Sequence, residues 1–213
     1  MRHTMHETPM LSIDALFFED KIPTWASGEC VVQPKLDGVA LELVYDDGKL
    51  TVASLRGDGT VGEIVTEQAS EVEGVQALLH GEHPAHVVIR GEVTADASVK
   101  GSRRHVASGR LRSKTADRSC LRFHGYTIAA GFTYSNEAEA VSARGSWGFV
   151  TPLTVTTMSK SDVVHAINVF TKMAHDFQSD GVVVKVADVE EREHYGFGPR
   201  APRWAFAWKN GVI

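Results

Sequence analysis

The sequence has few of the residues that build zinc modules or cross-linked secreted proteins. Only two cysteines, Cys30 and Cys120, occur among its 213 residues, and they lie far apart without a metal-ligand spacing. This argues against a zinc module, and because nothing indicates secretion we expect two buried free thiols rather than a disulfide. No apolar run reaches the length of a membrane span, and no segment resembles a signal peptide. The sequence therefore predicts a cytoplasmic protein with no membrane partner.

An excess of positive charge is also lacking. The 22 basic and 27 acidic residues give a formal net charge of −5, which does not by itself indicate a nucleic-acid binder. Between Lys100 and Arg122, however, eight lysines and arginines stand against a single acid, Asp117. Such a block either follows a phosphate backbone or forms a solvated loop, and we favour phosphate contact.

Composition and periodicity predict an α+β protein. With 43% apolar residues the chain can bury a full core, and it contains no repeat or low-complexity linker. Alternating or β-branched runs indicate strands, and longer amphipathic runs indicate helices, with Ser161 as the expected N-cap of the last long helix. We expect strands at residues 31–33, 41–45, 50–55, 87–93, 121–128, 182–186 and 204–208, helices at 63–79, 136–146 and 161–177, and an exposed acidic helix face at 190–193.

A lysine stands in a tight loop between two of these strands. Lys35-Leu36-Asp37-Gly38 follows the apolar pair Val31-Val32 and precedes a partly alternating run from Ala40 to Tyr45. A lysine projecting from this rigid edge would be a nucleophile once deprotonated, since a lysine with the ordinary pKa of about 10.4 attacks poorly. The same tetrapeptide also fits a surface turn with a solvated lysine, and the motif alone does not separate the two.

Two further motifs place a charge beside a glycine or a strand end. Arg56-Gly57-Asp58-Gly59 combines a cation with two glycines, which suits either close approach of the backbone to a phosphate or a hairpin turn. Glu92 follows an apolar strand, where its carboxylate could accept from a ribose hydroxyl or hold a hydrated metal. The alternative for Glu92 is a surface carboxylate paired with Arg90.

The C-terminal part of the sequence contains two strand candidates that end in lysines. The β-branched run 182–184 indicates a buried strand with Asp180 and Lys185 at its ends. A second apolar run, from Ala205 to Trp208, is followed by Lys209. Charges at the ends of buried strands are also common in solvated termini, so each run alone is compatible with a purely structural strand.

In their order, these motifs resemble those of the nucleotidyltransferase domain of NAD-dependent DNA ligases, over nearly the whole chain. Lys35-Leu36-Asp37-Gly38 is similar to the nucleophile motif, and residues 56–63 are similar to a glycine-rich stretch of the NAD-dependent branch. The implied fold is the ATP-grasp-like ligase adenylation fold, with antiparallel sheets flanking a nucleotide cleft, a lead-in segment at 1–30 and the adenylation domain at 31–213. The remaining matches are residues 9–14, 90–93, 104–112, 123–126, 179–185 and 198–209.

The resemblance implies a covalent mechanism centred on Lys35. Its amine would attack the α-phosphorus of NAD, forming lysyl-AMP and releasing nicotinamide mononucleotide. AMP would then pass to the 5′-phosphate of nicked DNA, where the 3′-hydroxyl displaces it. Lys185 and Lys209 would converge with Lys35 on one phosphate and neutralise the developing charge, and Asp37 completes the predicted catalytic group.

The resemblance also implies ligands for the nucleotide, the polynucleotide and Mg²⁺. Tyr126 and Val183 would stack on the two faces of adenine, and Glu92 would meet the ribose. Mg²⁺ would be held largely through water, with Asp180 and Glu92 as anchors. The nucleotide-binding set is Gln33, Leu36, Arg56, Glu92, Tyr126 and Val183, and the polynucleotide or phosphate set is Arg104 and Arg112.

Two departures from the family pattern leave the base preference and the polynucleotide steps open. The family has a glutamate where this chain has Gln33, and that glutamate accepts from the adenine amino group. Glutamine can still accept through its carbonyl oxygen, but its amide can also donate to a carbonyl on another base. In the arginine loop, His105, Val106 and Ser108 replace asparagines and part of an alanine run.

The sequence also lacks the further modules of bacterial family members. We find no nicotinamide-recognition module, OB-fold, zinc module, helix-hairpin-helix array or BRCT domain. One interpretation is the catalytic subunit of a split ligase whose other modules lie on a second chain. Another is a stand-alone nucleotidyltransferase or RNA ligase that uses NAD, ATP or another donor. The third is a non-catalytic nucleotide- or nucleic-acid-binding module, which the joint presence of the candidate site residues disfavours.

Overall fold

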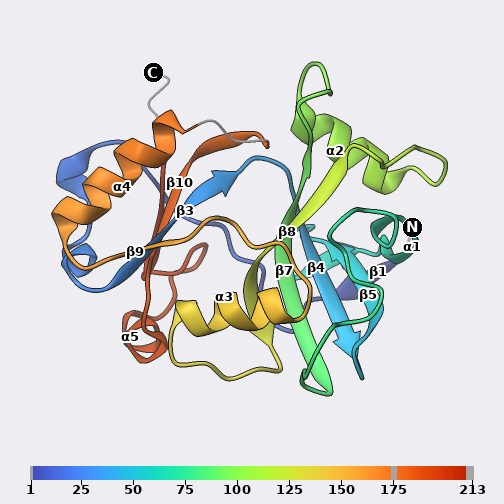
Figure 1. Ribbon diagram of the computed structural model, residues 1–213, viewed down its shortest axis with the longest axis horizontal. Coiled ribbons are helices and arrows are strands. Elements are labelled where there is room, and N and C mark those ends of the chain that lie inside the picture. The colour runs from blue at the N-terminus through green and yellow to red at the C-terminus, as the bar shows by residue number, and fades with distance from the viewer. Residues whose placement is uncertain (1, 174–176, 210–213) are drawn as a thin grey trace.

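Two β-sheets form the centre of the computed structural model, which describes residues 2–173 and 177–209 (Figure 1). The five-stranded sheet contains, in spatial order, β2 (Ala15–Leu16), β11 (Ala205–Trp208), β10 (Ser179–Val186), β3 (Cys30–Leu36) and β9 (Val155–Thr157). The four-stranded sheet contains β5 (Lys49–Leu55), β4 (Val39–Asp46), β7 (His86–Ala95) and β8 (Leu121–Ala130). Neighbouring strands are antiparallel except for the parallel pair β2 and β11.

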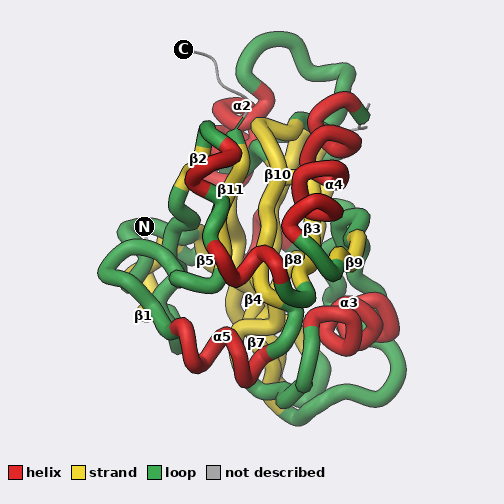
Figure 2. The backbone as a smooth tube through the Cα atoms, turned by 90° about the vertical axis from the view of Figure 1, so that its left-hand side faces the viewer, coloured by secondary structure: helices red, strands yellow, loops and turns green. Residues whose placement is uncertain are grey.

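The five-stranded sheet packs one face against α4 (Lys160–Lys172), as Figure 2 shows. Side chains alternate along β3 and β10, so Val32, Val182 and Val184 enter the core beneath α4. The intervening residues of β10, Val183 and Lys185, lie on the opposite face. This second face carries several of the residues that the sequence assigned to the site.

The four-stranded sheet has a separate core. Leu41, Leu43 and Ile89 from its central strands pack with Phe123 of β8 and with Trp147, which follows α3 (Glu137–Ser146). The other helical segments are short: η1 (Glu19–Lys21), η2 (Thr24–Ser27), α1 (Thr66–Ala69), α2 (Arg103–Arg112) and α5 (Val189–Tyr195).

The N-terminal residues join both sheets. β1 (His3–Met5) pairs with β6 (Val61–Glu63). In the sequence, β6 follows β5, a strand of the four-stranded sheet. Further along, β2 adds to the edge of the five-stranded sheet beside β11. The chain crosses between the sheets again from β3 to β4, with only Asp37 and Gly38 between the two strands. The lysine tetrapeptide is therefore the crossing point between the sheets.

The predicted α+β class and antiparallel sheets are confirmed, but two helix predictions need correction and one helix was not predicted. The only helix in the segment 63–79 is α1, which ends at Ala69. Gly74 could not continue a helix, because its φ is 90° and a Cβ there would stand 2.6 Å from the Phe123 carbonyl oxygen. The last long helix begins one residue after Ser159, whose side chain accepts from the Asp162 N–H, so Ser161 is not its N-cap. That helix ends at Lys172, and residues 174–176 of the predicted span lie outside the described residues.

The helix that was not predicted is α2. Only Ala107 and Leu111 are buried on this helix, and its other positions are largely charged or polar, so it lacks an apolar stripe. By contrast, the acidic helix face expected at 190–193 lies in α5.

Both cysteines are free and buried, as expected. Burial raises the pKa of the Cys30 thiol to about 12, so this thiol stays protonated at neutral pH. Within residues 2–173 and 177–209, no helix combines the length and the apolar character that crossing a membrane requires.

Candidate active site

Two lysines from different strands share one carboxylate. The Lys35 Nζ, near the end of β3, lies 2.8 Å from Asp180 Oδ1, and the Lys209 Nζ lies 3.1 Å from Asp180 Oδ2. The side chains of Lys35 and Asp180 are 24% and 30% exposed, so solvent and solutes reach the cluster. Although partial burial raises the pKa of Asp180, hydrogen bonds and charge from the two lysines lower it overall and hold the carboxylate ionised.

The strand crossing brings Lys35 close to Glu92 of the other sheet. A Cβ at Gly38 would stand 2.1 Å from the Val93 carbonyl oxygen and 3.1 Å from Glu92 Cγ, so only glycine permits this approach. Asp37 is fixed by its N–H, which donates to the Gln178 carbonyl at 2.8 Å, and its carboxylate lies 3.6 Å from Arg104 Nη1.

The surroundings of Glu92 disfavour the charged form of its carboxylate. Burial raises its pKa to about 7, while the positive charges of Lys35 and Arg104 and the Gly38 N–H oppose the increase. Tyr126 lies nearby on β8, where burial and the Glu92 charge raise the pKa of its hydroxyl. A half-buried acid that titrates near neutral pH is typical of functional sites.

Lys185 does not join Lys35 and Lys209 as the sequence predicted. In the register of β10 with β3, Lys185 stands opposite Val31, four residues before Lys35. Its Nζ lies 2.9 Å from Glu137 Oε1 and donates to the Tyr126 carbonyl at 3.4 Å. Because strand residues are about 3.3 Å apart, Lys185 is placed about 13 Å along the sheet from Lys35. The contact with Tyr126 places it where β10 meets β8 of the other sheet.

Glu137 balances a buried cluster that sequence reasoning missed. Its carboxylate accepts from Lys185, from Arg144 at 3.0 Å and from Arg192 at 2.9 Å, and both Glu137 and Arg144 are fully buried. Although burial raises the pKa of Glu137, the three cations hold it at about 2. Burial lowers the pKa of Lys185 to about 8 against the pull of Glu137. The pKa of Glu137 is lowered because three cations surround this one carboxylate, whereas the pKa of Lys185 is lowered by burial and by the neighbouring arginines.

Gln33 lies opposite Val183 on the face that also carries Lys35 and Lys185. Its Nε2 donates to Thr154 Oγ1 at 2.7 Å, and that hydroxyl donates to the Pro152 carbonyl at 2.9 Å. Because a carbonyl can only accept, the Thr154 hydrogen is directed to Pro152, and its oxygen must accept from Gln33. This chain fixes the amide orientation. Val183 is half-buried, whereas Leu36 is buried and stands opposite Ser179.

Arg56 lies in a loop between β5 and β6, and we call residues Arg56–Thr60 the Arg56 loop. Its guanidinium donates from Nη1 to Ser12 Oγ at 3.3 Å, and its N–H donates to the Ala40 carbonyl at 3.3 Å. Ala40 pairs with Glu92, so the Arg56 loop flanks that carboxylate across β4. The turn is built by Gly57, with a φ of 56°, and by Asp58, which accepts from the N–H groups of Thr60 and Val61.

The two arginines assigned to phosphate contacts lie on one helix, α2. Arg104 is 57% exposed, and Arg112 Nε donates to Glu63 Oε2 at 2.9 Å. In the rest of the basic block, Arg118 pairs with Glu71 and Arg122 pairs with Glu73. Acidic partners therefore offset charge throughout the block, including that of Arg104 and Arg112, although the Arg104 side chain stays largely exposed.

Among the described residues, few other metal-ligating side chains lie near the predicted metal anchors, Asp180 and Glu92. Within residues 2–173 and 177–209, no three histidine, cysteine or acidic side chains gather in a metal-binding group. The charge of Lys35 acts on Glu92, and both oxygens of Asp180 already contact ammonium groups. Two carboxylates suit an ion that keeps most of its water and takes phosphate oxygens as further ligands.

Comparisons with known proteins identify the family to which the chain as a whole is similar. The family model described as the NAD-dependent DNA ligase adenylation domain matches residues 1–211. A DNA ligase of Corynebacterium jeikeium (strain K411) is 32% identical over 98% of this chain and 34% of its own length. A DNA ligase of Syntrophobacter fumaroxidans is 34% identical over 96% of this chain and 36% of its own length. The chain thus spans about a third of the length of these relatives.

Solved structures with the same fold include more distant ligases. A mycobacterial DNA ligase D complexed with ATP and MES aligns with a TM-score of 0.53 at 13% identity, covering 92% of this chain and 60% of that chain. An archaeal ATP-dependent RNA ligase aligns with a TM-score of 0.58 at 15% identity, covering 95% of this chain and 48% of that chain. At these identities the likeness shows a nucleotidyltransferase fold alone. Because the family model matches nearly every residue, the chain belongs to the NAD-dependent DNA ligase adenylation domain family.

Proposed function

We propose that this chain forms a lysyl-AMP intermediate at Lys35 from NAD and transfers AMP to the 5′-phosphate of a polynucleotide. The observation that carries the proposal is the pairing of Lys35 and Lys209 on Asp180, at the crossing between the sheets. One lysine is the nucleophile, and the other is a cation within reach of the same phosphate. The family match supports NAD as the AMP donor.

The covalent step needs an amine, a leaving group and charge neutralisation. The Lys35 ammonium, which solvent reaches, loses a proton to water, and its nitrogen then forms a bond to the α-phosphorus of NAD. The bond from that phosphorus to the bridging oxygen breaks, and nicotinamide mononucleotide leaves with the electron pair. Lys209 would stabilise the negative charge on the phosphoryl oxygens, and Asp180 would orient both amines.

The remaining candidate residues would bind the nucleotide and the polynucleotide. Tyr126 and Val183 come from the two different sheets, which suits the two faces of an adenine ring. Lys185 would act at the base end of the site rather than at the phosphate, given its place opposite Val31. Glu92 would meet the ribose, and Arg104 and Arg112 would contact the polynucleotide from α2.

Mg²⁺ is part of the proposal. Asp180 and Glu92 would anchor the ion, mainly through its water ligands. When bound, the ion would neutralise charge on the phosphates. Asp37, 3.6 Å from Arg104, would keep the crossing loop in place beside these carboxylates.

Intact-mass spectrometry tests the covalent step. After incubation with magnesium and NAD, the chain is expected to gain one AMP, about 329 Da, because a phosphoramidate forms at one lysine. Lys35→Ala is expected to gain nothing, whereas Lys160→Ala, at a lysine of α4, should behave as the unchanged chain. A parallel incubation with ATP identifies the donor. No gain by the unchanged chain with NAD would contradict the proposal.

We further propose that nick sealing needs modules on a second chain, as in a split ligase. The DNA ligases to which the chain is similar have about two thirds of their length outside the matched part. In the same assay series, sealing of nicked duplex DNA is expected only after a chain with an OB-fold is added. Efficient sealing by this chain alone would overturn the split-ligase arrangement and favour a stand-alone enzyme.

The Gln33 amide gives a prediction about the base. Because its Nε2 is committed to Thr154, its carbonyl oxygen is the group left to accept from an amino group at position 6 of a purine. We expect NAD to exceed nicotinamide hypoxanthine dinucleotide by about tenfold or more in kcat/KM for adenylation. Thr154→Val should reduce this ratio to a few-fold, because the amide is then free to turn. Thr156→Val on β9 is the matched control, and an unchanged ratio in Thr154→Val would contradict the orientation.

A further inference from the structure

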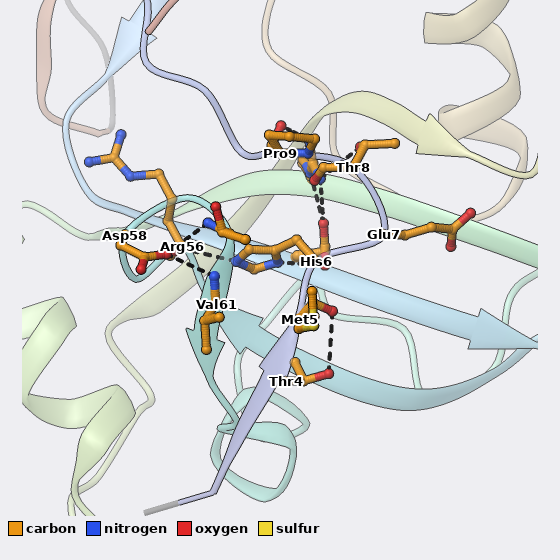
Figure 3. A network of polar contacts seen from close by, with 12 residues as sticks. Thr4, Met5, His6, Glu7, Thr8, Pro9, Arg56, Asp58 and Val61 are labelled. Carbon is orange, nitrogen blue, oxygen red and sulfur yellow. Dashed lines mark hydrogen bonds and ion pairs between the residues drawn. The ribbon is translucent and has the colours of Figure 1, made fainter. Parts of the chain in front are cut away.

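A buried histidine connects the N-terminal segment to the Arg56 loop. His6 is 7% exposed, and Figure 3 shows its ring between the Arg56 loop and the chain at Thr8 and Pro9. Its Nδ1 lies 2.7 Å from Glu42 Oε1, and its Nε2 lies 3.0 Å from the Arg56 carbonyl oxygen. The ring also fills the space beside Gly62, where a Cβ would stand 2.8 Å from its Cε1.

Both ring nitrogens of His6 face groups that accept. A backbone carbonyl has no hydrogen to donate, so Nε2 must carry a proton to bond Arg56. Glu42 accepts two hydrogen bonds on its other oxygen, from Arg90 Nε at 2.8 Å and Nη2 at 2.7 Å, which favours its ionised form. Nδ1 must then carry a proton as well. A doubly protonated imidazolium beside an ionised Glu42 satisfies all of these contacts together.

The charges around the ring are consistent with this form. Glu42 on β4 faces His6 directly, and Arg90 on β7 lies on the far side of that carboxylate. Asp58 in the Arg56 loop is the second carboxylate nearby, and the positive charge of His6 contributes to the lowered pKa of Asp58, after the N–H groups of Val61 and Thr60. Two carboxylates therefore offset the charges of His6 and Arg90.

The same segment holds the Arg56 loop at two further points. The His6 N–H donates to the Thr60 carbonyl at 2.9 Å, and the Met10 N–H donates to the Gly59 carbonyl at 2.8 Å. Arg90 anchors the segment in turn, because its guanidinium donates to the carbonyls of Thr8 and Pro9. In Figure 3 the Arg56 side chain extends away from His6, on the other side of its own backbone. These contacts with the N-terminal segment thus fix the backbone of the Arg56 loop, while the guanidinium itself contacts Ser12.

We propose that His6, as an imidazolium between Glu42 and the Arg56 carbonyl, is a positioning residue that fixes the Arg56 loop beside the nucleotide site. This rests on the proposed function and on the assignment of Arg56 to the nucleotide-binding set that the family resemblance implies. His6 touches neither nucleotide nor reacting atoms and acts through the Arg56 backbone. Its loss should therefore weaken nucleotide binding more than the chemical step, and KM for NAD should change more than kcat.

Two amide variants separate positioning from packing. The amide nitrogen of His6→Gln can take the place of Nε2 and keep the bond to Arg56, whereas that of His6→Asn can take the place of Nδ1 and keep only the bond to Glu42. We expect kcat/KM for lysyl-AMP formation to fall about tenfold in His6→Asn, mainly through KM, and by less than about threefold in His6→Gln. His165→Asn, on the exposed side of α4, is the matched control.

Two measurements on the free protein decide the proposal without nucleotide. The ¹⁵N spectrum of the His6 ring at neutral pH is expected to show two protonated nitrogens. Amide hydrogen exchange of residues 57–61 should be faster in His6→Asn than in His6→Gln. One unprotonated ring nitrogen, or equal exchange and kcat/KM in the two folded variants, would overturn the proposal. If the unchanged chain forms no lysyl-AMP, the proposed function fails. The ¹⁵N spectrum and the exchange rates still decide whether His6 fixes the Arg56 loop.

Discussion

Replacing Glu137 by glutamine is expected to lower the free energy of unfolding by about 3–5 kcal/mol, the range for removing one partner of a buried ion pair. Glutamine has nearly the same shape, but its neutral amide offers one acceptor where the carboxylate offers two. Lys185, Arg144 and Arg192 would remain buried without a balancing charge. Urea denaturation at pH 7 measures the loss.

The pH dependence gives the same prediction an independent check. In the folded chain the pKa of Glu137 is held at about 2, below the ordinary 4.5, so its stabilisation is complete above pH 4.5 and is lost as pH falls towards 2. Glu137→Gln should lack this component of acid sensitivity. Glu190→Gln, at an exposed position on α5, should leave the urea midpoint nearly unchanged. A loss below about 1 kcal/mol in Glu137→Gln, as for a surface ion pair, would contradict its role as the balancing charge.

The cluster around Glu137 also links Lys185 to the way in which the two sheets meet. Glu137 begins α3, Lys185 lies on β10 and Arg192 lies on α5, so the carboxylate joins elements around the five-stranded sheet to a helix that packs beside β8. Lys185 donates in addition to the Tyr126 carbonyl on β8. Disturbing Glu137 should therefore alter how the two sheets meet at the base end of the proposed site.

Sequence patterns predicted the secondary structure correctly where the local pattern of residues matched the burial of that segment in the fold. The β-branched run Val182–Val184 is a buried strand, and the lysine tetrapeptide is a tight connection between two strands. The segment 63–79 failed because Val65, Val72 and Leu79 are buried by turns that pack on the four-stranded sheet, and their spacing imitates a helix. Gly74, with its positive φ, was the one local sign against a helix there.

The site was predictable in part for a similar reason. Motif order indicated Lys35, Lys209 and Asp180, and these three side chains meet. The position of Lys185 depends on strand register, which motif order does not contain. Glu137 and Glu139 are both acids in the first turn of one helix, yet one is fully buried and the other exposed, and no local pattern separates them. Partners such as His6 and Glu42 are 36 residues apart and meet only in the folded chain.

Replacing Glu92 by glutamine is expected to act in the opposite direction to Glu137→Gln and to stabilise the folded chain above pH 7. Burial raises the folded-state pKa of Glu92 from 4.5 to about 7, so the folded state holds a proton more tightly than the unfolded state does. Stability from this group is therefore lost as pH rises from 4.5 to 7, and the full cost persists above 7.

The size of the stabilisation in Glu92→Gln follows from the pKa shift of Glu92. A change of this size corresponds to at most about 3 kcal/mol, and because the side chain is partly exposed we expect about 1–3 kcal/mol of stabilisation in Glu92→Gln at pH 8. The difference from the unchanged chain should vanish near pH 4, and Glu190→Gln, at an exposed position on α5, should show no such trend. Lower stability of Glu92→Gln at pH 8 would mean that Lys35 and Arg104 outweigh burial. If the variant is more stable but forms lysyl-AMP more slowly, the carboxylate is retained at a cost in stability because nucleotide binding requires it.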